Sequence, residues 1–173
     1  LLTLGNVHFS VLVLHPQQSA WALYDGSETS RAEIDRLNSA LRSTVQTLEH
    51  AQIPFHLGDD QMLSQHASIE GNRLCVGAQR YRAVIISPCL SLDARVAALL
   101  AQFAQNGGTI LCAEAEEPKA QAAVGIPYLS DGVSCANLRR LAGGFLRVPL
   151  HQIAQALPSG CRPFSLKRPG GSP

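Results

Sequence analysis

The chain has 173 residues and a formal net charge of +1, and 46% of its residues are hydrophobic while 16% are charged. This composition is too apolar for a disordered chain and is sufficient for one ordinary domain with a buried core. The near-neutral charge gives no electrostatic reason to expect a nucleic acid or a membrane surface as a partner. No apolar run approaches the roughly 20 residues that a membrane-spanning helix needs.

The first third of the chain alternates strand-like and helix-like segments. Residues 7–14, VHFSVLVL, are apolar enough for a strand that is buried on both faces. A short second strand is expected in residues 53–60, IPFHLGDD, followed by one or two helical turns in DQMLSQH. Between the two strands, residues 28–52 are predicted to form an amphipathic helix, because apolar side chains recur there at helical spacing: Ile34, Leu37, Leu41, Val45 and Leu48.

The middle of the chain begins with a turn signal, Gly71-Asn72 between two short runs, which predicts a β-hairpin. Residues 82–87, RAVIIS, then predict a central strand. Residues 92–105 predict an amphipathic helix with Asp93 in its first turn, closed by Asn106-Gly107-Gly108. Residues 109–114, TILCAE, predict a fourth strand. Short helices are expected after it, at residues 119–124, 135–141 and 150–157.

This order of elements predicts an α/β fold. We expect a three-layer sandwich with a mostly parallel flavodoxin-like or Rossmann-like sheet, helices on both faces and a small β-hairpin insertion. The domain is expected to span residues 1–157. Residues 158–173 are interpreted as a tail or linker, because their KRPGGSP ending is typical of one. The chain starts with Leu1 and not with Met, so we also expect a processed product or a piece of a longer protein.

Cofactor and metal motifs are missing from the predicted strand ends, where ligands of such sheets usually bind. There is no G-x-G-x-x-G and no P-loop, Pro16 has no amide hydrogen, and Trp21 is bulky. We therefore expect no nucleotide or flavin cofactor. Metal-ligand spacings such as C-x-x-C and H-E-x-x-H are also missing, so no metal is expected.

Cys89 is the candidate nucleophile, because it lies just past the predicted central strand. A nucleophile elbow needs small neighbours, whereas Cys89 is flanked by Pro88 and Leu90 with no glycine within two residues. The candidate bases lie far away in the sequence. A buried thiol is therefore the favoured interpretation, with a catalytic thiol as the alternative.

The loop after the first strand, HPQQSAWALYD, offers a different kind of site. Two interpretations remain open for Trp21 and Tyr24: packing of a short helical turn, or contact with another domain or subunit. His15 is interpreted as a strand-end histidine that bonds to a backbone group. The candidate interface residues are His15, Gln17, Trp21 and Tyr24.

Two stretches of the chain resemble a domain that follows the catalytic barrel in certain glycoside hydrolases. VLVLHPQQSAWALYD is similar to the opening of that domain. The stretch from IEGNRLCV to NGGTIL resembles its later part, a hairpin, strand, helix and Gly-Gly turn. The family is that of the α-L-rhamnosidase-like proteins of glycoside hydrolase family 106, with the β-galactosidase trimerisation domain as a more distant relative. The resemblance covers about residues 7–113, and its motifs are structural.

The resemblance implies that residues 1–157 form a class I glutamine amidotransferase-like domain without the Cys-His-Glu machinery of true amidotransferases. The catalytic carboxylates of that family lie on the barrel, which this chain does not contain. We therefore expect a noncatalytic accessory domain that packs against the barrel of the parent protein or a neighbouring subunit, with a homo-oligomer among the assemblies it allows. Gln17-Gln18 replaces an aromatic and an acid of the relatives, which argues against direct sugar binding by this loop.

Two alternative functions remain from the residues alone. One is a small enzyme of the amidotransferase superfamily with Cys89 as its nucleophile. The other is a small-molecule binding module that uses the strand ends as a pocket.

Overall fold

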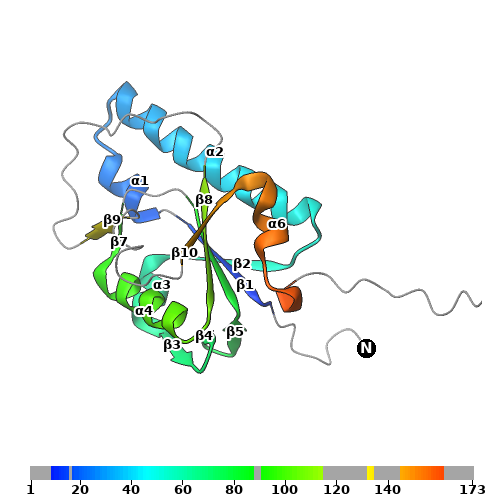
Figure 1. Ribbon diagram of the computed structural model, residues 1–173. Coiled ribbons are helices and arrows are strands. Elements are labelled where there is room, and N and C mark those ends of the chain that lie inside the picture. Colours follow the sequence, from blue (N-terminus) through cyan, green and yellow to red (C-terminus); the bar gives the residue numbers. More distant parts are fainter. Residues whose placement is uncertain (1–8, 16, 88–90, 115–131, 135–144, 162–173) are drawn as a thin grey trace, which may run out of the picture.

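A five-stranded parallel sheet forms the centre of the computed structural model, which describes residues 9–15, 17–87, 91–114, 132–134 and 145–161 (Figure 1). Its order is β10-β8-β6-β1-β2, and every neighbouring pair is parallel. Counted along the chain, this is the order 2-1-3-4-5 of flavodoxin-like folds. The predicted α/β class is therefore confirmed. The strands are β1 (Val11–Leu14), β2 (Phe55–Gly58), β6 (Ala83–Ile86), β8 (Thr109–Glu114) and β10 (Phe145–Pro149).

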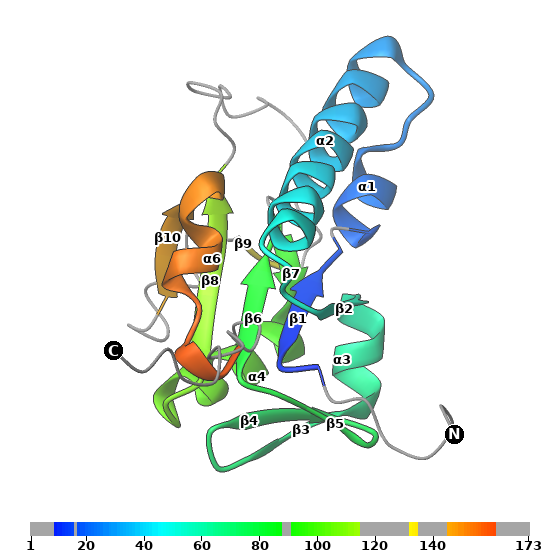
Figure 2. The same cartoon turned by 90° about the vertical axis from the view of Figure 1, so that its right-hand side faces the viewer.

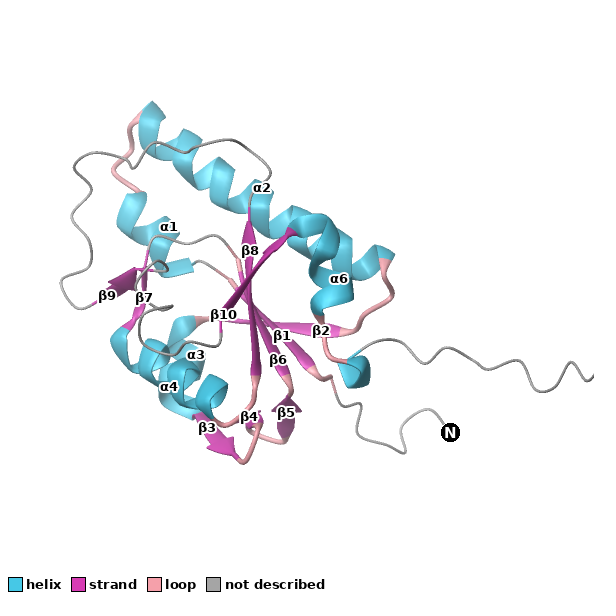
Figure 3. Ribbon diagram, viewed as in Figure 1, coloured by secondary structure: helices cyan, strands magenta, loops and turns pink. Residues whose placement is uncertain are grey.

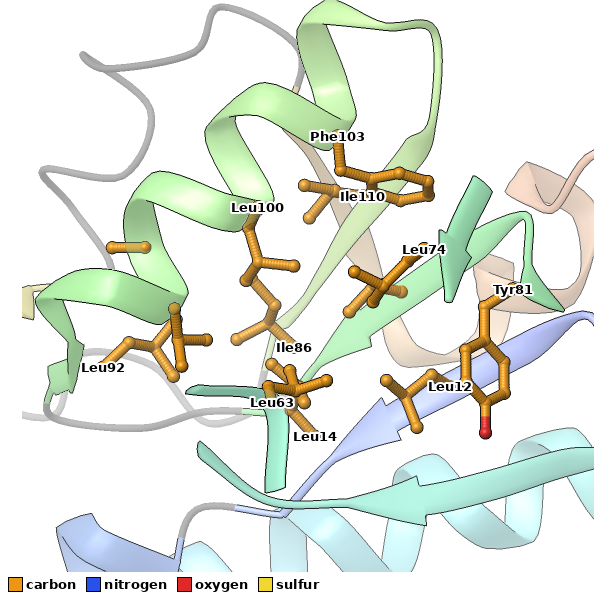
Figure 4. Close-up of a cluster of buried hydrophobic side chains, with 13 residues drawn as sticks. Leu12, Leu14, Leu63, Leu74, Tyr81, Ile86, Leu92, Leu100, Phe103 and Ile110 are labelled. Atoms are coloured by element: carbon orange, nitrogen blue, oxygen red, sulfur yellow. The ribbon is translucent and has the colours of Figure 1, made fainter. Parts of the chain in front are cut away.

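Two hydrophobic clusters, one on each face of the sheet, make the three layers. Alternate side chains of a strand point to opposite faces, so Leu12 and Leu14 join the cluster under α3 (Asp60–His66) and α4 (Ala94–Gln105), shown in Figure 4. Val11 and Val13 join the cluster under α2 (Glu28–His50) and α6 (Ile153–Ala156). Figure 3 shows the helices on both sides of the sheet.

The long helix α2 follows its predicted range closely. Ser27 caps its start, with the side-chain Oγ accepting a hydrogen bond from Ser30 N at 3.1 Å. Of the predicted apolar stripe, Leu37 and Leu48 are buried, and the other members are half-buried. Ala40 and Thr44 complete the buried side, with Thr44 Oγ1 donating to the carbonyl of Ala40 at 2.9 Å. None of the described helices is long and apolar enough to cross a membrane.

Helix α4 starts two residues later than its sequence pattern suggests. Asp93 is its N-cap residue and lies before the first turn: its Oδ1 accepts hydrogen bonds from Arg95 N at 2.8 Å and Val96 N at 3.2 Å. The predicted end is confirmed, because Gly107 adopts a positive φ of 86° just past the cap residue.

The predicted hairpin is confirmed and carries a third strand. Strands β3 (Ala67–Glu70), β4 (Arg73–Val76) and β5 (Gln79–Tyr81) form an antiparallel sheet. Gly71 lies in the predicted turn with a φ of 57°. This small sheet lies below the amino ends of the parallel strands, on the side opposite α1 (Gln17–Leu23) (Figure 2).

Several elements were not expected from the sequence. The fifth strand of the main sheet, β10, is one, and the antiparallel pair of β7 (Ser91–Asp93) and β9 (Gly132–Ser134) is another. The helical turns expected around residues 150–157 are present as η1 (Leu150–Gln152) and α6. The chain continues into η2 (Ser159–Cys161), where Cys161 packs in the same cluster as Val11. The helices expected at residues 119–124 and 135–141 lie outside the described residues.

Candidate functional site

The carboxyl ends of three parallel strands meet at one level of the sheet. Leu14 pairs with Gly58 on one side and with Ile86 on the other, so β1, β2 and β6 end together. In this strand order the direction of the chain connections switches at β1 and β6, and ligands of open α/β sheets bind beside such a switch. His15, Asp59 and Ser87 follow the three strand ends directly.

His15 is held in this edge through its main chain. Its amide N donates to the carbonyl of Gly58 at 2.8 Å, and its own carbonyl accepts a hydrogen bond from Gln17 N at 2.9 Å. The side chains of His15 and Gln17 are half-buried. Both bonds join main-chain atoms, so the strand end is fixed without using the imidazole ring.

Helix α1 is held to the fold by one side and exposes the other. Ser19 and Leu23, four residues apart, are 1% and 5% exposed, and α1 contacts α2 and β7. Trp21 and Tyr24, three residues apart, are 64% and 67% exposed. We call the surface formed by these two side chains the α1 aromatic face. The interpretation of Trp21 and Tyr24 as packing residues does not fit this geometry, because small and aliphatic side chains form the buried side instead.

The turn between α1 and α2 has its own hydrogen bond and a glycine with positive φ. Asp25 Oδ1 accepts a hydrogen bond from Ser27 N at 2.8 Å, and Gly26 takes a positive φ of 83°. Hydrogen bonds from Ser27, with a smaller one from Ser30, lower the pKa of the exposed Asp25 to about 2. The carboxylate therefore stays ionised at neutral pH and accepts the Ser27 amide in the turn between α1 and α2.

Acidic side chains gather where the start of α3 contacts β7. Asp60, the first residue of α3, is 4% exposed, and its Oδ2 accepts a hydrogen bond from Asp93 N at 3.3 Å. Burial, together with the negative charges of Asp93 and Asp59, raises the pKa of Asp60 to about 6. Within the described part of the chain, Asp60 Oδ1 and Ser87 Oγ are the buried side-chain atoms without a hydrogen-bond partner, and both follow strand ends of this edge.

The structure bears differently on the other candidate sites predicted from the sequence. Cys89 and Pro16 lie outside the described residues. Among the residues that the structure describes, no group of three or more histidine, cysteine, aspartate or glutamate side chains is placed to hold a metal ion. Asp60 and Ser87 were not singled out from the sequence, although the Asp59-Asp60 pair that ends the second predicted strand was a signal for this edge.

The fold and this edge together define a flavodoxin-like α/β protein. Comparisons with protein-family models, with curated proteins and with solved structures find no match.

Proposed function

We propose that this chain is a noncatalytic docking domain and that the α1 aromatic face is the surface through which it assembles with a partner. The observation that carries the proposal is the exposure of Trp21 on α1 and of Tyr24 directly after its last residue, while Ser19 and Leu23 on the opposite side of the helix are buried. Aromatic side chains are the commonest energetic centres of protein interfaces, and exposed groups of them mark interaction sites.

The size of the effect is adequate for an interface centre. The exposed parts of the two rings add up to on the order of 200 Å², which stabilises a complex by about 5 kcal/mol before the entropic cost of association. The turn through Asp25 and Ser27 fixes α1 in advance, so little ordering is needed on binding.

The resemblance to family 106 supports a particular parent protein. We propose that the domain belongs to an α-L-rhamnosidase-type glycoside hydrolase and that its partner is the catalytic barrel or a neighbouring subunit. A first test is isolation of the natural full-length polypeptide with its bound partners. The proposal predicts a barrel with paired carboxylates in the same chain or in a co-purifying one, and an assembly without such a barrel contradicts this part of it.

The docking face itself is tested by calorimetric titration of the partner with variants of this chain. Trp21→Ala and Tyr24→Ala are each expected to weaken binding by about 30-fold, equivalent to about 2 kcal/mol. Leu146→Ala is the matched control, because Leu146 is 56% exposed on the edge strand β10. Two outcomes argue against the α1 aromatic face as the docking surface: an equal loss of affinity in all three variants, or no loss in any of them.

A second candidate function, binding of a small polar molecule at the carboxyl edge, is favoured by the unpartnered Ser87 Oγ and Asp60 Oδ1. Buried polar atoms in native proteins nearly always have a hydrogen-bond partner, and a ligand can supply one. A thermal-shift screen with rhamnose, galactose, nucleotides and flavins tests this function. A shift that Ser87→Ala removes supports it, and no shift with any of these compounds counts against it.

A further inference from the structure

The carboxyl group of Asp60 connects two parts of the fold that are distant in sequence. It starts α3, and its Oδ2 accepts the amide hydrogen of Asp93, the residue at which β7 ends and α4 is capped. Asp93 in turn holds the first amides of α4 through its own Oδ1. The two acids therefore form a short chain of hydrogen bonds from α3 through the end of β7 to α4.

This carboxyl lies in surroundings that do not favour its ionised form. The residue is 4% exposed, and Oδ1 has no hydrogen-bond partner among the described residues. The elements packed against α3 carry charged side chains at Asp93 on β7, Arg95 on α4 and Glu70 on β3. Two negative charges repel the ionised Asp60 carboxyl. They belong to Asp93 and to Asp59, which lies at the capping position of α3.

We propose that Asp60 is a proton-controlled latch that holds the start of α3 against the junction between β7 and α4. When the carboxyl is protonated, it carries no charge to be repelled by Asp59 and Asp93, and its second oxygen still accepts the Asp93 amide. When it is ionised, the hydrogen bond from the Asp93 amide favours the charge, but burial and the two neighbouring carboxylates outweigh this bond. Local opening of the junction then becomes more favourable because it exposes the charge to water.

The direction of the pH effect follows from the raised pKa of about 6, against an ordinary value of 3.8. A group whose pKa is raised in the closed state stabilises that state fully below its ordinary pKa, and the stabilisation is lost as the pH rises through the raised pKa. The closed state of the junction is therefore more stable in acid and less stable at neutral pH. β7 also contacts α1, so opening of the junction removes part of the packing that holds the α1 aromatic face in place. This last consequence rests on the proposed function.

Native-state hydrogen exchange of the free chain tests the latch without any partner. The probe is the Asp93 amide, which donates to Asp60, and its protection is corrected for the intrinsic pH dependence of exchange. Between about pH 5 and about pH 7.5 the corrected protection is expected to fall roughly tenfold. Amides of the central strands, at Ile85 and Leu111, open only with the whole fold. They are expected to fall by a similar factor but to stay better protected than the Asp93 amide at every pH, which distinguishes local opening of the junction from unfolding of the whole chain.

Two variants separate the latch from a general effect of pH. Asp60→Asn cannot titrate and is expected to make the Asp93 protection independent of pH in this range. Asp59→Asn is the matched control, because asparagine keeps the cap that Asp59 Oδ1 provides to Met62 N, and it should retain most of the tenfold fall. Unchanged protection in the unmodified chain, or the same fall in Asp60→Asn, overturns the proposal. The comparison in the unmodified chain decides alone if Asp60→Asn does not fold.

Discussion

The hydroxyl oxygen of Tyr81 lies 2.9 Å from Nδ1 of His56, and this hydrogen bond ties the edge strand β2 of the parallel sheet to the small antiparallel sheet. Burial raises the pKa of Tyr81, so the phenol stays protonated at neutral pH and can donate to the imidazole. The ring of His56 also packs against Phe9, with ring centroids 4.1 Å apart.

Tyr81→Phe removes this hydrogen bond while keeping the buried ring, so it is expected to lower the free energy of unfolding by about 1 kcal/mol. A double-mutant cycle with His56→Ala, measured by urea unfolding, should give a coupling energy of similar size. Strictly additive effects of the two substitutions would show that the bond does not contribute to stability.

Asp60→Asn is expected to stabilise the whole chain at neutral pH. The ordinary pKa of the side chain is 3.8 and the folded value about 6, so ionisation of the buried acid costs up to about 3 kcal/mol once the pH exceeds the folded pKa. Urea unfolding from about pH 4 to about pH 7.5 should show the unmodified chain losing stability relative to Asp60→Asn as the pH rises. If the difference in the free energy of unfolding between the two proteins stays constant over this range, the prediction is contradicted.

Gly108→Ala tests the close approach of the chain to a core ring after α4. A Cβ atom at Gly108 would collide with the ring of Phe103, which is fully buried, so the expected loss is about 2–3 kcal/mol. Gly107→Ala meets no such ring and suffers from its positive φ of 86°, with an expected loss of about 1 kcal/mol. Thermal unfolding should rank the two in this order, and the reverse ranking contradicts the packing described for Phe103.

Trp21→Ala is expected to change the stability of the free chain by less than about 0.5 kcal/mol, because most of the ring faces water. Leu48→Ala, at a fully buried position near the end of α2, should cost about 2–5 kcal/mol. Denaturant titrations of both variants make the comparison. A large loss for Trp21→Ala would mean that its ring is part of the core and not of a docking surface.

Much of the fold was predictable because its signals are local. The run Ala83–Ile86 is apolar throughout, and α4 carries its cap at Asp93 and its stop signal at Gly107, so pattern and turn chemistry agree. The strand β10 was missed because it is an edge strand: Leu146 and Arg147 are exposed, and the apolar alternation is too short to stand out. Its place beside β8 depends on contacts that are distant in sequence.

The candidate site was predictable in position but not in its details. The loop after β1 was recognised, yet sequence could not decide whether Trp21 is buried, since an aromatic side chain is ordinarily a better core residue than Ser19. The structure buries Ser19 because α1 packs against α2 and β7 with the side that carries Ser19 and Leu23. Asp60 was missed for a similar reason: its burial comes from a partner 33 residues away, at Asp93.

The most direct test of the docking face uses the fact that Trp21 is the only tryptophan of the chain. Fluorotryptophan incorporated into this chain gives one fluorine resonance, whose shift between light and heavy water reports water contact of the ring. The proposal predicts a solvent shift typical of an exposed indole in the free chain and its loss in the complex with the unlabelled barrel or subunit. A ring already shielded in the free chain, or still water-exposed in the complex, contradicts it.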